Sequence, residues 1–424
     1  MKNTRGTSFG GYRQALLAAV ITFTVGMSYG AYTMLIEPLS QRLNCTLTAA
    51  GLPATFENIA CFTTGLLLSG YLIEKWTARR CLLINAFLSS FFVAAYAYLP
   101  SLPLLCGWEM VIGASMAFGF TNALSAFIRK WFIQRREAML GIALASNGLG
   151  GAFGVWFYTN LENAFGVFVA CGAFAIIGVV CVLLGILFLR NPEQMGQKPL
   201  SWETLPALEG PEKAGEGKDA ENFGITFREA LRTPSLYLIM ASCLLCCMSM
   251  VLSPYFPTIL QVNGVDKMEA ANYATINALA LATASVVFGA VTAKLDGKAY
   301  ILVAFGAATL GLVALGGWLT DGKALFLAPA AMLLGAGYGI GNSYGPIVTT
   351  KVFGNKCYDR VIPLIYAMRG VGLALGVLLL PSLAERQGSW VSSVLVAGVT
   401  MILAIAMGLA AMYLAPMKKL HHAQ

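Results

Sequence analysis

The sequence predicts an all-α integral membrane protein in which twelve transmembrane helices form two pseudo-symmetric six-helix bundles. Three observations predict this fold class. The chain is 58% hydrophobic and only 11% charged, whereas soluble domains carry about 25% charged residues. Apolar runs of about 20 residues, the length that spans a bilayer, recur along the whole chain. The second half of the chain repeats short patterns of the first half in the same order.

The apolar runs follow one another from end to end of the chain. A helix rises about 1.5 Å per residue, so a run of about 20 residues crosses the hydrocarbon core. The first run is too long for a cleaved signal peptide and lacks a small-residue cleavage site after it. The runs cover roughly 14–37, 48–73, 81–99, 103–128, 138–158, 165–189, 235–260, 270–293, 299–319, 324–349, 361–384 and 390–415.

Residues 190–233 form the long polar segment between the sixth and seventh runs. Pro, Gly, Glu and Lys dominate this segment, a composition typical of a flexible linker. We therefore expect an N-terminal six-helix bundle over 1–189, a linker over 190–233, and a C-terminal six-helix bundle with a short tail over 234–424.

Lys and Arg residues gather on one side of the predicted membrane, and this bias sets the orientation. With both termini inside, 23 of the 28 Lys and Arg residues lie in inner segments, 4 lie in outer segments, and Arg369 lies within a run. We therefore expect a multi-pass protein of the cell inner membrane, with both termini and the linker in the cytoplasm. The net charge of +8 then belongs to the inner face and indicates no nucleic-acid partner.

The ten cysteines predict neither disulfides nor a metal centre. Most of them lie within apolar runs, where Cys packs as a small apolar residue. The two histidines, His421 and His422, lie in the polar tail. The runs contain no Ser-His-Asp set, metal cluster or Walker-type phosphate loop, so we expect no enzyme, no built-in ATPase and no bound cofactor.

The two halves of the chain repeat each other at one offset. The stretch "GASMAFG", which starts at Gly113, matches "GAGYGIG", which starts at Gly335. The stretch "ASNGLGGAFG" (145–154) matches "AMRGVGLALG" (367–376) at the same offset. Tandem repeats of this kind in transporters place a substrate site at the repeat interface near the bilayer midplane.

Two kinds of motif resemble the major facilitator superfamily. The stretch "GYLIEKWTARR" (70–80) resembles the superfamily's loop motif between the second and third helices, which locks the halves together on the cytoplasmic side. "WFIQRREAMLGIALASNGLGGAFG" (131–154) and "VFGNKCYDRVIPLIYAMRGVGLALG" (352–376) resemble the branch of the oxalate/formate antiporter and the monocarboxylate transporters. The residues that fit the loop motif are Gly70, Glu74, Arg79 and Arg80.

The resemblance implies the major facilitator fold and the transport of small carboxylates bound by cations in the eighth and eleventh helices. Arg369 lies where the oxalate transporter carries a Lys, but the eighth run has small residues near Ser285 in place of a cation. One cation suits a monocarboxylate or a larger organic anion better than a dicarboxylate. We expect this anion, protons and the lipid bilayer to be the partners of a monomer.

Arg369 is the first candidate for substrate binding. It lies about nine residues into its run, roughly 13 Å deep, where a guanidinium is costly unless it faces a cavity or a partner. Its planar fork suits a carboxylate, and the competing interpretation is a structural ion pair. In the repeat Arg369 aligns with Asn147, so one half offers a cation where the other offers an amide.

Two carboxylates lie within the runs of the first half. Glu57 in the second run is a candidate for proton coupling, because burial and a nearby Arg act on its protonation in opposite directions. Glu109 in the fourth run lies closer to the outer surface, and we expect a structural role for it. The residues expected to line the substrate cavity with Arg369 are Tyr29, Asn147, Asn342 and Tyr344.

These features predict a secondary transporter of a small organic anion, with a monocarboxylate as the first choice. It would work by alternating access, as a proton symporter or an anion exchanger. An exporter of amphipathic compounds and a non-transporting membrane sensor on the same scaffold are the alternatives. The deep cation favours an anionic substrate over the first alternative, and the lack of a sizeable soluble domain disfavours the second.

Overall fold

The computed structural model describes residues 10–132, 136–197, 224–291, 296–341, 344–354 and 356–416. The helices are α1 (Gly11–Tyr32), α2 (Ile36–Leu43), α3 (Leu47–Leu67), α4 (Ser69–Trp76), α5 (Ala78–Ser90), α6 (Phe92–Tyr98), α7 (Leu102–Gly119), α8 (Thr121–Trp131), α9 (Arg136–Phe165), α10 (Val167–Phe188), α11 (Pro192–Met195), α13 (Phe227–Leu231), α14 (Pro234–Met250), α15 (Leu252–Val262), α16 (Lys267–Val291), α17 (Gly297–Asp321), η1 (Ala324–Phe326), α18 (Leu327–Gly341), α19 (Tyr344–Phe353), α20 (Tyr358–Gln387) and α21 (Val391–Tyr413).

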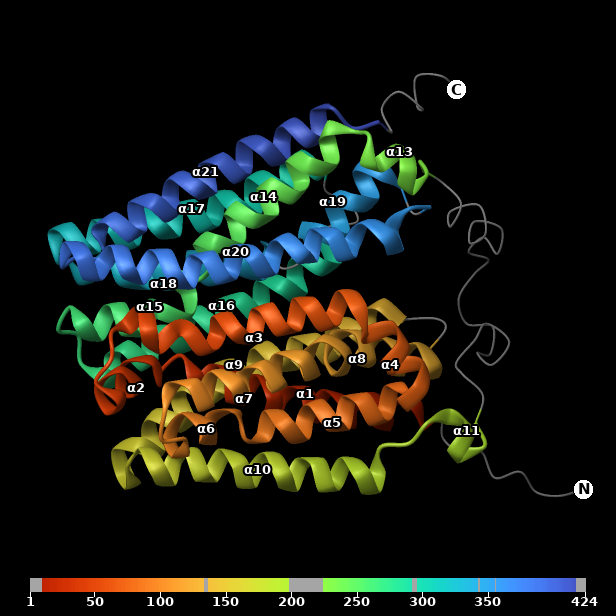
Figure 1. Cartoon of the computed structure of the whole chain (residues 1–424), viewed down its shortest axis with the longest axis horizontal. Coiled ribbons are helices and arrows are strands. Elements are labelled where there is room, and N and C mark those ends of the chain that lie inside the picture. The colour runs from red at the N-terminus through yellow and green to blue at the C-terminus, as the bar shows by residue number, and fades with distance from the viewer. Residues whose placement is uncertain are drawn as a thin grey trace, which may run out of the picture.

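The long helices lie side by side along one direction, as Figure 1 shows. We call α1 to α10 the N-terminal half and α14 to α21 the C-terminal half. The short helices α11 and α13 lie at one end of the assembly, which we call the linker end. The opposite end, where α2 and α15 lie, is called the far end.

The helices have the length and composition of membrane spans. In the described chain, 11 helical stretches are long and apolar enough to cross a membrane. α3 adds a helix of 21 residues that carries the polar pair Glu57 and Asn58 near its centre. Large apolar side chains point outward, so a lipid-facing surface covers the bundle. Leu16, Ile176 and Leu395 are 67%, 67% and 65% exposed. The predicted all-α membrane fold is therefore confirmed.

Several spans consist of two consecutive helices. Breaks lie at Leu68 between α3 and α4, at Phe120 between α7 and α8, and at Val251 between α14 and α15. Such breaks let a span bend, because the regular ladder of backbone hydrogen bonds is interrupted there. Residues 342–343, between α18 and α19, lie outside the described residues, and Asn342 is one of them.

The repeat predicted from the sequence reappears as equivalent helix contacts. α9 packs on α1 so closely that a Cβ added at Gly154 would lie 2.0 Å from Met27 O. In the other half α20 packs on α14, and a Cβ at Gly376 would lie 2.4 Å from Met248 O. Both contacts need a residue without a side chain, and the two glycines are the last residues of the matching stretches 145–154 and 367–376.

A second pair of contacts follows the same rule. A Cβ at Gly113 of α7 would lie 2.0 Å from Glu57 O of α3, and a Cβ at Gly335 of α18 would lie 2.1 Å from Asn277 O of α16. Glu57 and Asn277 are therefore equivalent positions of the two halves. Small residues permit this close approach of helices in a membrane.

The two ends of the linker are each attached to a different half. Arg190 N donates to Gln14 Oε1 at 2.7 Å, which attaches the start of the linker to α1. Ile225 N donates to Phe353 O at 3.1 Å, which attaches its end to the C-terminal half. Residues 198–223, most of the predicted linker, lie outside the described residues.

The glycine contacts give a test of the helix packing. We expect Gly154→Ala to destabilise the protein by about 1–3 kcal/mol, because α1 or α9 must shift to accept the methyl group. Gly141→Ala in the same helix is the matched control, since a Cβ there meets nothing within 4 Å. Thermal unfolding of the purified variants in detergent measures both effects. Equal unfolding temperatures for the two variants would contradict the packing described.

Candidate functional site

Arg369 lies near the middle of α20, at the interface of the two halves. The next residue, Gly370, faces α3, and a Cβ there would lie 3.2 Å from Phe62 Cβ. Arg369 is half-buried, and its charge acts on Cys61 of α3 and is acted on by Cys247 of α14. A cation at this place acts on groups of both halves, as a group that binds a substrate between them must do.

Asn147 occupies the equivalent place in α9. Its neighbour Gly148 faces α16 of the other half, and a Cβ there would lie 2.6 Å from Ala282 Cβ. The Asn147 amide donates from Nδ2 to Thr22 O of α1 at 3.1 Å. The structure therefore gives Asn147 and Arg369 matching positions at the two contacts between the halves, and it ties the Asn147 amide to its own half.

Glu57 and Tyr29 form one hydrogen-bonded unit. Tyr29 Oη donates to Glu57 Oε1 at 2.5 Å, and the Tyr29 ring stacks on Phe92 with centroids 4.5 Å apart. Glu57 also acts electrostatically on Cys61, the thiol on which Arg369 acts. The sequence predicted the two residues separately, and the structure joins them on the side of the interface that faces Arg369.

Tyr344 lies inside the C-terminal half. Its side chain is 2% exposed, and its ring packs against Phe305 of α17 with centroids 5.0 Å apart. A Cβ at Gly408 of α21 would lie 3.2 Å from the Tyr344 hydroxyl. In this conformation Tyr344 is a packing residue of the bundle.

Three cysteines of α14 lie near Arg369. Cys243, Cys246 and Cys247 all act electrostatically on the guanidinium. Over the described ranges, no group of three or more His, Cys, Asp or Glu residues could hold a metal ion. We therefore assign these thiols to the polar surroundings of Arg369.

The predicted loop motif contacts its own half in this conformation. Arg79 Nη2 donates to Ile186 O at the end of α10, at 2.7 Å. Arg79 and Arg190 also line an open hollow of about 270 Å³ at the linker end. Gly70 lies in α4, and Glu74 and Arg80 are exposed.

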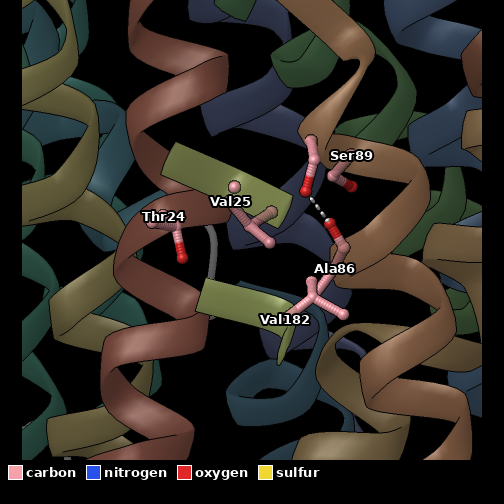
Figure 2. Close-up of a pocket in the computed structure, with 7 residues that line it drawn as sticks. Thr24, Val25, Ala86, Ser89 and Val182 are labelled. Carbon is pink, nitrogen blue, oxygen red and sulfur yellow. Dashed lines mark hydrogen bonds between the residues drawn. The ribbon is translucent and has the colours of Figure 1, made fainter. Parts of the chain in front are cut away.

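A small cavity inside the N-terminal half is not a substrate site. It lies between α1, α5 and α10, and its volume of about 10 Å³ holds at most one water molecule. Aliphatic groups and three hydroxyl side chains surround it, and Figure 2 labels Thr24 and Ser89 among them. The lining residues are Thr24, Val25, Ala86, Ser89, Ser90, Gly178 and Val182.

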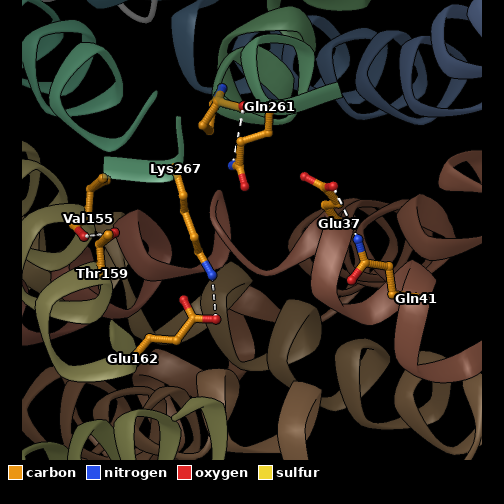
Figure 3. Close-up of polar contacts among 8 residues, drawn as sticks. Glu37, Gln41, Val155, Thr159, Glu162, Gln261 and Lys267 are labelled. Atoms are coloured by element: carbon orange, nitrogen blue, oxygen red, sulfur yellow. Dashed lines mark hydrogen bonds and ion pairs between the residues drawn. The ribbon is translucent and has the colours of Figure 1, made fainter. Parts of the chain in front are cut away.

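An ion pair joins the halves at the far end. Lys267 Nζ, at the start of α16, lies 2.6 Å from Glu162 Oε1 near the end of α9. The Glu162 side chain is 7% exposed, so much of this pair is removed from water. The charge of Lys267 also acts on Glu37 of α2. Figure 3 shows Lys267 reaching down to Glu162, with Glu37 on the neighbouring helix.

A second carboxylate joins the halves near the end of the corresponding helix of the other half. Glu385 of α20 accepts hydrogen bonds from Thr48 N and Thr48 Oγ1, both at 2.8 Å. Thr48 lies in the first turn of α3, where free backbone N–H groups favour an anion. Glu162 and Glu385 both lie in the last turn of their helices, α9 and α20. We call these two contacts, Lys267–Glu162 and Thr48–Glu385, the far-end latch.

Sequence reasoning missed the far-end latch. Lys267 is one of the four Lys and Arg residues that the sequence analysis counts in outer segments. Its partner Glu162 lies on a helix of the other half. The available signal was the repeat, because Glu162 and Glu385 lie in the last turns of two corresponding helices of 30 residues each, one residue out of register with each other.

The comparisons with known proteins agree with this architecture. The family described as Major Facilitator Superfamily matches residues 18–362 and 238–424. Among curated proteins, none matches this sequence. A partially occluded inward-open conformation of the xylose transporter XylE from E. coli superposes with a TM-score of 0.67 at 13% identity, over 93% of this chain and 97% of that chain.

Two further solved structures are similar to the chain. A mutant of the nucleoside transporter NupG has a TM-score of 0.71 at 14% identity, over 95% of this chain and 99% of that chain. A bacterial homologue of the human lysosomal transporter Spinster, inward-facing and unoccupied, has a TM-score of 0.66 at 13% identity, over 97% of this chain and 98% of that chain.

The far-end latch gives a testable prediction. In Lys267→Glu two carboxylates face each other, so the far end should open more often. We expect hydrogen–deuterium exchange in the C-terminal part of α9 and the N-terminal part of α16 to become at least about tenfold faster, a change of about 1.4 kcal/mol. Mass spectrometry of peptides from these segments measures the exchange.

Two controls sharpen this test. The charge swap of Glu162→Lys with Lys267→Glu should restore slow exchange, because it re-forms the pair. Lys323→Glu should leave exchange unchanged, since the Lys323–Asp321 pair is 68% and 51% exposed and such surface pairs contribute little. Unchanged exchange in Lys267→Glu would mean that the pair does not hold the far end closed.

Proposed function

The chain belongs to the Major Facilitator Superfamily, and on that premise we propose that it is a secondary transporter of a small organic anion, with a monocarboxylate as the first choice. The substrate binds between the halves near the middle of the membrane and is reached alternately from either side. The similar solved structures, at 13–14% identity, share the fold, so the substrate is argued from this chain's own residues.

The position of Arg369 carries the proposal. A guanidinium at the centre of a membrane helix is costly unless it binds something there. Its two parallel N–H donors match the two oxygens of a carboxylate. The equivalent residue Asn147 is neutral, so one side of the site carries a cation and the other an amide. A monocarboxylate likewise has one charged end and one uncharged end.

A single cation favours a monocarboxylate over a dicarboxylate. On α16, the eighth span, the position expected for a second cation lies near Ser285. The Ser285 hydroxyl can donate a hydrogen bond to Leu281 O at 2.8 Å or to Gly339 O at 3.0 Å. Within the described part of α16, the one cation is Lys267 at the far-end latch. The second carboxylate of a dicarboxylate would then lack a matching charge on this helix.

The conformation fits one step of alternating access. The far-end latch closes one end of the assembly, while Arg79 of the loop motif bonds within its own half. We assign the linker end to the cytoplasm by the positive-inside rule, so this conformation faces inward. Glu57, which accepts a hydrogen bond from Tyr29, acts on the same thiol as Arg369, and Glu57 is the group we propose for coupling to protons.

The role of Arg369 predicts the effect of its replacement. A hydrogen bond to a charged group contributes about 1.5–3 kcal/mol, and about 1.4 kcal/mol is a factor of ten. Arg369→Gln should therefore weaken binding of acetate, lactate or formate by about one to two orders of magnitude. Arg369→Lys keeps the charge but loses the fork, so it should be intermediate. Uptake into proteoliposomes over a panel of mono- and dicarboxylates measures these changes.

A matched control on the same helix is Arg386→Gln, an exposed cation at the far end that should leave anion uptake unchanged. All variants must unfold at similar temperatures. If Arg369 only forms a structural ion pair, its replacement would lower the stability of the protein and its anion binding together. If well-folded Arg369→Gln transports the anion as the unmodified protein does, the site lies elsewhere.

The orientation is tested by thiol labelling. Cys357 at the linker end is 2% exposed, and burial raises the pKa of its thiol, so it reacts slowly. The exposed positions Lys356 and Gln387 serve better. In right-side-out vesicles an impermeant reagent should label Gln387→Cys and leave Lys356→Cys unlabelled until the membrane is opened. The reverse pattern would contradict the assigned orientation.

A further inference from the structure

We propose that Glu57 and Glu109 form one proton-binding site inside the N-terminal half, and that Glu109 carries the bound proton. This deepens the coupling role proposed above for Glu57, because it adds a second carboxyl group and assigns a proton to it. The ligand is a hydrogen ion, taken from water and returned to it.

Glu109 is a buried carboxyl group without a partner among the residues that the structure describes. It lies in the first half of α7 and is 0% exposed. Neither Oε1 nor Oε2 has a hydrogen-bond partner there. The sequence suggested a structural role near the outer surface, but a structural carboxylate would accept hydrogen bonds. An isolated charge at this depth costs so much that the group takes up a proton instead.

Glu109 lies close to Glu57. Gly113, one helical turn after Glu109, touches the backbone of Glu57, where an added Cβ would lie 2.0 Å from Glu57 O. The two carboxyl groups repel each other when both are charged. Two carboxyl groups in one apolar site therefore share a proton, since both cannot ionise there.

The hydrogen bond from Tyr29 decides which group holds the proton. Tyr29 Oη donates to Glu57 Oε1 at 2.5 Å, and a donated hydrogen bond stabilises the ionised form of a carboxyl group. Glu109 receives no such bond from the described residues, so it holds the proton while Glu57 is ionised. The other titratable side chains that act on the pair are Tyr32, Tyr96, Cys61 and Cys106.

The second half of the chain shows that these carboxyl groups are not needed for packing. At the position equivalent to Glu57 it carries Asn277, which donates from Nδ2 to Ala331 O at 3.0 Å. Ala331 precedes Gly335 of α18 by one helical turn, as Glu109 precedes Gly113 of α7. The same helix contact is therefore built with an amide and a methyl group, and the acidic pair is an addition of the N-terminal half.

The location links this proton to the substrate site. Glu57 and Arg369 act on the same thiol, Cys61, from the two halves. Transfer of the proton from Glu109 to Glu57 neutralises the carboxylate nearer to Arg369, and Glu109 becomes the ionised group. Release of the proton to water leaves the pair more negative by one charge. The proton thus changes the electric field in which Arg369 binds an anion.

Infrared spectroscopy of the full chain in lipid bilayers tests this proposal without any substrate. At about pH 8 an exposed Glu is fully ionised, so a carbonyl band of a protonated carboxylic acid reports a buried acid. We expect this band, with its small shift in heavy water, in the unmodified protein. It should be absent from Glu109→Gln and Glu109→Ala, and present in Glu57→Gln.

Glu269→Gln, a change at an exposed carboxylate of α16, is the control and should keep the band. Glu109→Ala copies Ala331 of the other half, so it should fold, and thermal unfolding checks both Glu109 variants. A band that persists in folded Glu109→Gln, or that is missing from the unmodified protein, overturns the proposal. Since no anion is used, this test can fail or succeed independently of the Arg369 variants.

Discussion

The architecture depends on the close approach of helix backbones at glycine. Lipid is as apolar as the helix surfaces, so the hydrophobic effect does not drive helices together within a membrane, and packing contacts must do so. At Gly154 and Gly376 the backbone of one helix lies against a carbonyl oxygen of the next, with no room for a methyl group. Gly113 and Gly335 repeat the arrangement in another helix pair. Because equivalent glycines make equivalent contacts, both halves have the same frame, and the frame constrains where any polar group can lie.

The polar groups depart from this symmetry where the proposed chemistry occurs. Arg369 is equivalent in the repeat to the neutral Asn147, and Glu57 is equivalent to Asn277. A charge in the membrane interior is expensive, whereas an amide in the same frame is satisfied by one or two hydrogen bonds, as Asn277 is. The C-terminal half therefore supplies a cation and the N-terminal half supplies acids, and the two meet near Cys61. The proposed anion and the proposed proton would influence each other across this interface, because both would act on the same small volume of low dielectric.

The sequence predicted the helices and their repeat better than it predicted the contacts between individual side chains. Hydropathy and the constant offset of the repeat gave the spans and the equivalence of Asn147 with Arg369, because both are properties of local pattern. The pairing of Lys267 with Glu162 depends on how two bundles tilt against each other, which no local pattern encodes. Tyr344 sat in a polar, glycine-rich stretch, yet its ring fills a space beside Phe305. The burial of Glu109 could not be predicted, since sequence position gives depth along a helix but not the face that a side chain occupies.

The contacts between the halves at Gly148 and Gly370 have a mechanical consequence. Both glycines lie near the middle of helices of 30 residues, against Ala282 and Phe62 of the opposite half. At each of these two points a glycine without a side chain faces a Cβ atom of the opposite half. No side chain of either glycine interlocks with the opposite helix, and we expect one bundle to roll on the other there, with the two contacts as the pivot. Each helix then acts as a lever with arms of about 20 Å, and a rotation of a few degrees at the pivot becomes a displacement of ångströms at the ends. The speed of the cycle would therefore be set by how smooth this pivot is, as well as by how tightly the ends are held.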